Sequence, residues 1–231
     1  MAYVIEPPRP VVVPVLGDGL FPVRRVYCVG RNYAAHAREM GADPTREAPF
    51  FFCKPADAVV SVGPEGMLEL PYPVATANLH YEAELVVAIG LGGADIPVDE
   101  ALAHVWGYGV GLDMTRRDLQ TALKDKGRPW ELGKAFDRSA PLSTLVPAGA
   151  IGHPQRAAIW LERNGESRQR ADIADMIWSV AEIVAHLSRY FRLEPGDLVF
   201  TGTPDGVGPV VAGDVVEAGV EGVGRLRVRY V

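Results

Sequence analysis

The sequence predicts an α+β fold in which strands dominate and helices are few and short. The 25 glycines and 19 prolines are spread along all 231 residues, which is typical of many short elements joined by tight turns. Several apolar, β-branched runs end at a glycine, as buried strands do. Since 48% of the residues are hydrophobic and 23% are charged, one core can form without disulfides, and a single domain is expected.

The first part of the chain is rich in proline, so residues 1–23 are expected to form an arm and residues 24–231 a single folded domain. The predicted elements that follow are a strand at 26–29, a short helix at 33–40 that Gly41 ends, and strands at 50–52, 85–89 and 105–112.

Alternate glycines at 107, 109 and 111 lie inside the last of these strands. Such a pattern indicates either the close approach of another backbone or a ligand, or a twisted strand packed against a neighbour. The sequence leaves both explanations open.

Two further helices are predicted from capping-box patterns, at 115–118 and at 179–182. The first is expected to end at Gly127. The second continues with an apolar face that packs on the core, made by Val180, Ile183, Val184, Leu187 and Phe191. The segment 198–231 alternates valine-rich runs with glycine turns and is expected to form antiparallel strands.

Composition narrows the class of partner. The net charge of −6 argues against nucleic-acid binding and favours a small-molecule partner. Cys28 and Cys53 fit neither a zinc site nor a disulfide framework, and free thiols favour a reducing cytoplasm. The early prolines argue against a secretory leader, and no apolar run is long enough for a bilayer, so a cytoplasmic location is expected.

Three carboxylates form the candidate metal site. Glu82 and Glu84 open the predicted strand at 85–89, and a period of two places both on one face. Asp113 ends the glycine-rich strand. Carboxylates this close would take up protons unless a cation lay between them, and an all-oxygen set suits Mg²⁺ or Mn²⁺. The alternative is a solvated strand face.

Other candidate residues carry weaker signals. His36 and Glu39 share a helix face and can form an imidazole oriented by a carboxylate, which is the arrangement of a general base, or they are a fortuitous surface pair. Lys134 can stabilise negative charge near a metal or lie at the surface. The segment 201–204 can present hydroxyl and N–H groups to a carboxylate, or form a tight turn. His80 is a possible neighbour of the glutamate pair.

Several motifs occur in order from about residue 23 to the C-terminus, and together they resemble the fumarylacetoacetate hydrolase superfamily, in particular its small acylpyruvate hydrolases. They are the sequences at 27–33 with His36 and Glu39, 52–55, 79–85, 111–118, 133–136 and 201–204. The segments at 21–40 and 50–57 most resemble the bacterial fumarylpyruvate hydrolase subgroup, which acts in aromatic-acid breakdown. One departure is Tyr81, where many relatives carry a second histidine.

The resemblance implies a β-roll fold, a homodimer and bound Mg²⁺ or Mn²⁺. It assigns the metal to Glu82, Glu84 and Asp113, catalysis to His36, Glu39 and Lys134, and substrate contacts to Arg117, Gln120 and Thr203. Water activated by His36 would attack the distal carbonyl, and pyruvate would leave as its enolate, held by the metal and Lys134.

Two rival functions are distinguishable. A lyase that decarboxylates oxaloacetate or a related 2-oxo diacid would use the same enolate but needs no general base, so His36 and Glu39 argue against it. A non-catalytic scaffold would turn over no 2-oxo acid. The residue that binds the distal carboxylate stays open among Arg31, Arg46 and Arg128, and so does the choice between Mg²⁺ and Mn²⁺.

Overall fold

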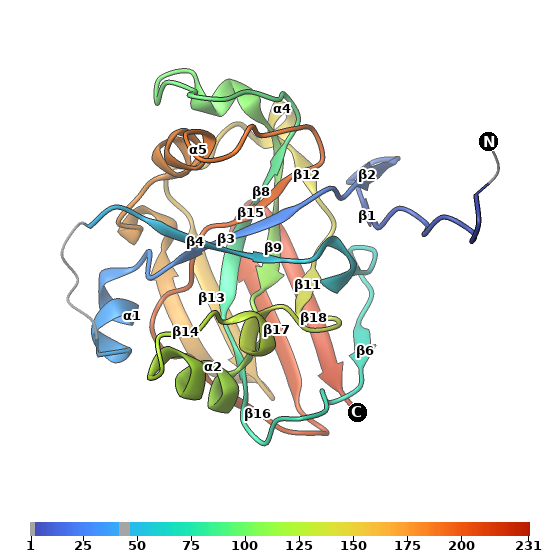
Figure 1. Cartoon of the computed structure of the whole chain (residues 1–231), viewed down its shortest axis with the longest axis vertical. Helices are drawn as coiled ribbons and strands as arrows, with labels where there is room; N and C mark the ends of the chain where they lie inside the picture. The colour runs from blue at the N-terminus through green and yellow to red at the C-terminus, as the bar shows by residue number, and fades with distance from the viewer. Residues whose placement is uncertain (1–2, 42–46) are drawn as a thin grey trace.

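The computed structural model describes residues 3–41 and 47–231. Strands dominate it, and its helices are short, so the strand-dominated α+β class predicted from the sequence is confirmed (Figure 1). The helices within the described residues are α1 (Ala34–Glu39), α2 (Arg117–Lys124), α3 (Glu131–Lys134), α4 (Ala148–Ile151) and α5 (Val180–Ser188), with one-turn 3-10 helices at Ala56–Ala58, Ala101–His104 and Ile173–Asp175.

The largest sheet has eight strands, and its main path runs in the order β4-β3-β15-β8-β9-β11-β5, with β12 paired to β9. These strands are β3 (Val26–Gly30), β4 (Phe50–Lys54), β5 (Val59–Ser61), β8 (Ala83–Ile89), β9 (Val105–Leu112), β11 (Ala140–Leu142), β12 (Val146–Pro147) and β15 (Leu198–Phe200). Strand β8 is buried along its whole length, as its continuous apolar run predicts.

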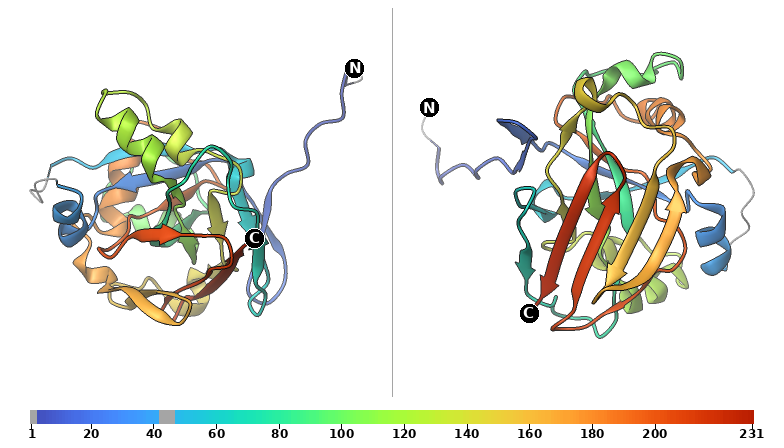
Figure 2. Two further views of the ribbon diagram at one scale, coloured as in Figure 1. Left: turned by 90° about the horizontal axis from the view of Figure 1, so that it is seen from below. Right: turned by 180° about the vertical axis from the view of Figure 1, so that it is seen from behind.

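A second sheet of five strands has the order β14-β13-β17-β18-β6, and Figure 2 shows it face on in the right-hand view. It consists of β6 (Leu68–Leu70), β13 (Ala158–Arg163), β14 (Glu166–Asp172), β17 (Val215–Val220) and β18 (Gly224–Tyr230). Strands β13, β17 and β18 contact β8 and β9, so the main core lies between the two sheets and extends under α5.

Two small sheets complete the fold. One has the order β10-β7-β16, from β7 (Leu79–Tyr81), β10 (Thr115–Arg116) and β16 (Gly208–Val210). The other is the hairpin of β1 (Val12–Pro14) and β2 (Leu20–Pro22). Val13 and Phe21 of this hairpin are buried in a second apolar cluster on the body. Residues 3–11, which precede this hairpin, extend away from the body (Figure 1).

The three alternate glycines of β9 are explained by packing. A Cβ atom at Gly107 would lie 2.3 Å from the carbonyl oxygen of Val146, and one at Gly111 would lie 2.5 Å from the Phe200 ring. Strand β12 and neighbouring core side chains therefore occupy the space that these glycines leave.

One predicted helix start is correct and the other is not. Ser179 and Glu182 form a capping box at the start of α5, as the sequence predicts. The box predicted at Thr115 is absent: α2 begins at Arg117, and Asp118 instead accepts hydrogen bonds from Thr76 Oγ1 and the Ala77 amide. Phe191 lies beyond the end of α5 and is 38% exposed, so it is not part of the apolar face of that helix, contrary to the prediction.

Both cysteines are free, with Cys28 buried and Cys53 exposed. No helix within residues 3–41 and 47–231 has the length and apolar character needed to cross a bilayer.

Candidate active site

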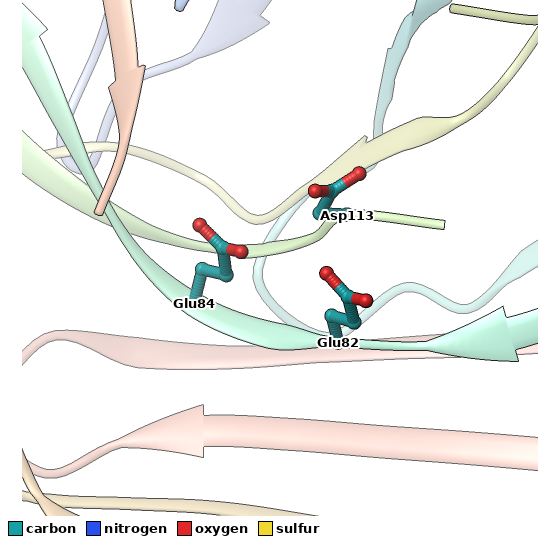
Figure 3. Close-up of side chains that lie close together, drawn as sticks. All are labelled: Glu82, Glu84 and Asp113. Carbon is teal, nitrogen blue, oxygen red and sulfur yellow. The ribbon is translucent and has the colours of Figure 1, made fainter. Parts of the chain in front are cut away.

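The three predicted metal carboxylates meet where β8 and β9 lie side by side. Glu82 immediately precedes β8, Glu84 is its second residue, and Asp113 immediately follows β9. Figure 3 shows both glutamates on one face of their strand, with Asp113 facing them from the neighbouring strand. One oxygen from each lies within 4.8 Å of the others, and all three residues are buried. The solvated strand face that the sequence left open is therefore excluded.

Three cationic side chains surround these acids. The Lys134 ammonium lies 2.8 Å from Glu82 Oε2 and 2.6 Å from Asp113 Oδ2. Lys54 lies 2.8 Å from Asp113 Oδ1, although not in hydrogen-bonding geometry, and Arg117 contacts Glu82 Oε1. Side-chain exposure of the two lysines is 4% or less. Three cationic side chains thus lie against three acidic side chains in a buried setting.

The ion pairs divide the acids into two kinds. Burial favours the neutral form of Glu82, but Lys134 and Arg117 outweigh burial and lower its pKa. No cationic side chain of residues 3–41 and 47–231 forms an ion pair with Glu84: burial, followed by the charges of Asp113 and Glu82, raises its pKa well above the usual range. Among the described residues, the Gly202 amide donates a hydrogen bond to Glu84 Oε2 at 2.7 Å. Burial would also lower the pKa of Lys134, but Asp113 and Glu82 raise it, so this lysine stays charged.

This donor set fits a divalent cation. All ligand atoms are oxygens, which suits Mg²⁺ or Mn²⁺ better than zinc. Burial and the neighbouring acids raise the pKa of Glu84, and Asp113 Oδ1 accepts no hydrogen bond from the described residues. A cation between the three carboxylates would satisfy both groups.

The predicted dyad forms on α1. His36 Nδ1 lies 3.2 Å from Glu39 Oε2, and the His36 side chain is only 8% exposed. Glu39 also accepts hydrogen bonds from the Gly206 amide, at 3.1 and 3.3 Å. The carboxylate therefore joins α1 to the loop after Thr203 and sets the orientation of the imidazole.

One cavity of about 260 Å³ brings the predicted groups together. Its lining includes all nine residues assigned from the sequence, namely His36, Glu39, Glu82, Glu84, Asp113, Arg117, Gln120, Lys134 and Thr203. Arg117 donates to Gln120 Oε1 at 2.5 Å, which links two of the predicted substrate contacts. Phe50, Phe52 and Trp130 supply an apolar wall.

The loop at 201–204 presents an N–H group to a carboxylate, as its sequence suggested, but the carboxylate is the protein's own Glu84. Gly202 adopts a φ of +98°, and a Cβ there would lie 2.7 Å from Asn32 Cβ. Only glycine fits this position without strain. Asn32 holds the loop by donating to the Thr201 carbonyl at 2.8 Å.

His80 lies outside the cavity lining and bonds Asn78 Oδ1 at 3.0 Å. Burial and then Arg117 lower its pKa to about 4, so it is neutral near pH 7. Among the three arginines left open for the distal carboxylate, Arg31 lines the cavity and Arg128 does not. Arg46 lies outside the described residues.

Two buried polar residues near the site were not singled out from the sequence. Lys54 ends the aromatic strand β4, and a lysine after such an apolar run was a usable signal of a buried charge. Gln169 occupies the one buried position of β14. Its side chain forms hydrogen bonds with Ala83, the first residue of β8, and with Thr203. Its strand is otherwise polar, so no local pattern distinguishes it.

Comparison with known proteins agrees with this site. The family model for the fumarylacetoacetate (FAA) hydrolase C-terminal region matches residues 25–231, so the chain belongs to the fumarylacetoacetate hydrolase family. The fumarylpyruvate hydrolase of Ralstonia sp. is 45% identical over 184 residues, covering 80% of this chain and 93% of that protein. The mitochondrial oxaloacetate tautomerase FAHD1 of Mus musculus is 44% identical over 204 residues, covering 88% and 90%.

Among solved structures, the fumarylpyruvate hydrolase of Pseudomonas aeruginosa in complex with Mn²⁺ and pyruvate has a TM-score of 0.98. The two chains share 63% identity, with 100% of this chain and 99% of that chain covered. The family fold expected from the sequence is thereby confirmed.

Proposed function

We propose that the protein is a metal-dependent hydrolase that cleaves a carbon–carbon bond of an acylpyruvate, with fumarylpyruvate as its substrate. One observation carries the proposal: a single cavity joins a buried all-oxygen cation site, an imidazole oriented by a carboxylate, and a buried lysine. These are the groups needed to activate water and to stabilise an enolate. The names of the Ralstonia and Pseudomonas proteins support the substrate.

In the proposed reaction, Glu82, Glu84 and Asp113 hold the divalent cation. When bound, this ion supplies Lewis-acid polarisation of the carboxylate and 2-oxo oxygens of the pyruvoyl group. With His36 Nδ1–H donated to Glu39, the lone pair of Nε2 is free to take a proton from water. The water oxygen bonds to the distal carbonyl carbon.

Cleavage then sends the electron pair of the broken carbon–carbon bond to the pyruvoyl fragment. The positive charge of Lys134 stabilises the negative charge that develops on this fragment as it becomes the enolate. A proton taken up at carbon completes pyruvate, and the water oxygen remains in fumarate.

The charge balance of the cavity supports a dianionic substrate. Lys54, Lys134 and Arg117 offset the three acids, so a divalent cation leaves an excess of two positive charges. Fumarylpyruvate carries a carboxylate at each end. A monoanion would leave part of this excess uncompensated in a buried site.

Arg31 is our proposed partner for the distal carboxylate. Its guanidinium carbon lies 5.5 Å from the centre of the Phe50 ring at the cavity wall, and it has no ion-pair partner in the described part of the chain. Its φ of 57° is uncommon for a residue other than glycine, and such conformations cluster at functional sites. A guanidinium matches a carboxylate in geometry and charge.

Replacing Arg31 by methionine should lower the selectivity for a substrate with a distal carboxylate. A charge-assisted hydrogen bond contributes about 1.5–3 kcal/mol, so kcat/KM for fumarylpyruvate relative to acetylpyruvate should fall roughly 10- to 100-fold. Steady-state kinetics with both substrates measures this ratio. Arg128→Met is the matched control and should leave the ratio unchanged, and an unchanged ratio in Arg31→Met would remove Arg31 from this role.

The hydrolase proposal is tested by following the loss of the acylpyruvate enol absorbance with Mg²⁺, with Mn²⁺ and with a chelator. We expect turnover only with metal, and fumarate and pyruvate in equal amounts. Full turnover in chelator, or no turnover of any acylpyruvate, would contradict the proposal.

A second candidate is chemistry on oxaloacetate or a related 2-oxo diacid at the same site. The cation site and Lys134 would stabilise its enolate equally well, and the mouse relative is named an oxaloacetate tautomerase. Product analysis with a panel of 2-oxo acids separates decarboxylation, tautomerisation and hydrolysis. A scaffold protein without catalytic activity would convert none of these 2-oxo acids.

We propose four further properties, which the resemblance and the composition support. These are a role in aromatic-acid breakdown, a homodimer, a cytoplasmic location and the action of residues 24–231 as one catalytic domain.

A further inference from the structure

Gln169 lies outside the cavity lining and connects two segments of the cavity wall, the start of β8 and the loop that carries Thr203. It is the only buried residue of β14, with 1% exposure. Its Oε1 accepts from the Ala83 amide at 3.0 Å, between the two metal glutamates. Its Nε2 donates to Thr203 Oγ1 at 2.9 Å and to the Pro204 carbonyl at 2.8 Å, and the Asp205 carbonyl is a more distant acceptor at 3.4 Å.

These partners fix which end of the amide is which. A backbone N–H can only donate, so the atom facing Ala83 must be the oxygen of Gln169. A backbone carbonyl can only accept, so the atom facing Pro204 must be the nitrogen. The second hydrogen of this nitrogen therefore points to Thr203, and the hydroxyl oxygen of Thr203 is the acceptor in that bond.

This arrangement determines what Thr203 can do in the cavity. Since Thr203 Oγ1 accepts from Gln169, its own hydrogen is left for another acceptor, and no acceptor for it occurs among the described residues. Thr203 lines the cavity and is 2% exposed. An oxygen of an anionic ligand is the partner that a buried O–H group in the cavity wall would bind.

The bond to Ala83 has a second consequence. Strand β15 pairs only with residues 86–88 of β8, so the Ala83 amide has no strand partner on that side. Gln169 supplies the missing acceptor at the point between Glu82 and Glu84. The Gln169 side chain therefore connects strand β8, which carries Glu84, to the loop that carries Thr203.

We propose that Gln169 is a positioning residue that makes the Thr203 hydroxyl a dedicated hydrogen-bond donor to a carboxylate or 2-oxo oxygen of the ligand. The proposal deepens the proposed function and rests on it for the ligand class, a 2-oxo acid. Gln169 acts through Thr203 and does not itself contact the ligand.

A double-mutant cycle on pyruvate binding tests this role. Isothermal titration with pyruvate at saturating Mn²⁺ compares Gln169→Glu in the natural background and in Thr203→Val. A carboxylate at 169 would accept the Thr203 hydrogen, so the substitution should weaken pyruvate binding about 10-fold, as expected for one lost hydrogen bond to a charged group. In the Thr203→Val background, the loss should be under about threefold, because contacting groups are coupled.

Gln169→Met adds no charge and removes the donor that holds Thr203 Oγ1, so its loss of pyruvate affinity should also be confined to the background that keeps Thr203; this variant serves if the glutamate variant does not fold. The matched control is Gln155→Glu, at an exposed glutamine that bonds the His153 carbonyl at 3.3 Å, and it should leave pyruvate affinity unchanged. The affinity for Mn²⁺ alone is measured in every variant, since a general loss of structure would weaken it too.

Equal losses of pyruvate affinity in the two backgrounds would overturn the inference, and so would no loss at all. Because the readout is binding, it is separable from the reaction. If the protein without substitutions bound pyruvate with Mn²⁺ but cleaved no acylpyruvate, the proposed function would be overturned. This inference would still stand.

Discussion

Replacing Glu84 by glutamine is expected to abolish tight Mn²⁺ binding and lower kcat/KM for the acylpyruvate by at least about 10³-fold, since a Lewis-acid metal contributes several kcal/mol to catalysis. Glutamine has nearly the same shape and can still accept from the Gly202 amide. It removes the negative charge that faces the proposed cation. Titration calorimetry with Mn²⁺ and steady-state kinetics measure the two losses.

The metal-free variant should at the same time have a higher melting temperature than the metal-free natural protein. Burial and the neighbouring acids disfavour the ionised form of Glu84, so its pKa is raised in the folded state. A group of this kind contributes stability at low pH that is lost as pH rises through the raised pKa, and a neutral glutamine does not lose it. Glu69→Gln, at an exposed strand position, is the control.

In the natural protein, Mn²⁺ binding should strengthen as pH rises, because the cation displaces the proton that Glu84 retains. A Glu84→Gln protein that binds Mn²⁺ normally would contradict the assignment of this ligand.

Replacing His36 by alanine is expected to lower kcat for acylpyruvate hydrolysis by roughly 10²–10⁴-fold, which is the usual contribution of a general base. Mn²⁺ affinity should stay within about twofold of the natural value, because His36 is not among the proposed ligands. Kinetics and metal titration on the same preparation separate the two effects.

The Glu39→Gln variant tests how the dyad works. Glutamine can still accept from His36 Nδ1 and from the Gly206 amide, but it no longer stabilises a protonated imidazole. We therefore expect a smaller loss of kcat than in His36→Ala. A His36→Ala protein that hydrolyses acylpyruvate at the natural rate would exclude the dyad, and one that acts only on oxaloacetate would favour the second candidate function.

The parts of the site that follow from local periodicity were predictable. Glu82 and Glu84 share a face because a strand has a period of two, and His36 reaches Glu39 because residues three apart are neighbours on a helix. The ordered motifs then indicated which of the possible explanations to prefer. The proximity of Glu82 and Glu84 to Asp113 depends on the pairing of β8 with β9, which periodicity alone does not specify.

Long-range bonds account for what was missed. Asp118 fits a capping box in sequence, but Thr76 and Ala77 compete for its carboxylate in the folded protein. Gln169 matters only because β14 passes behind the Thr203 loop, and the burial of Val13 depends on a hairpin that packs on a distant part of the chain. None of these contacts leaves a signal near the residue itself.

The ion pairs that Lys54, Lys134 and Arg117 make with the acids also bear on how the protein matures. A zinc finger cannot fold before it acquires its metal, because its ligands have no other partners. Here the protein's own cations already compensate two of the three acids, Glu82 and Asp113, and Glu84 can remain protonated. Folding can therefore precede metal loading, and the supply of metal in the cell would set the fraction of active molecules rather than the amount of folded protein.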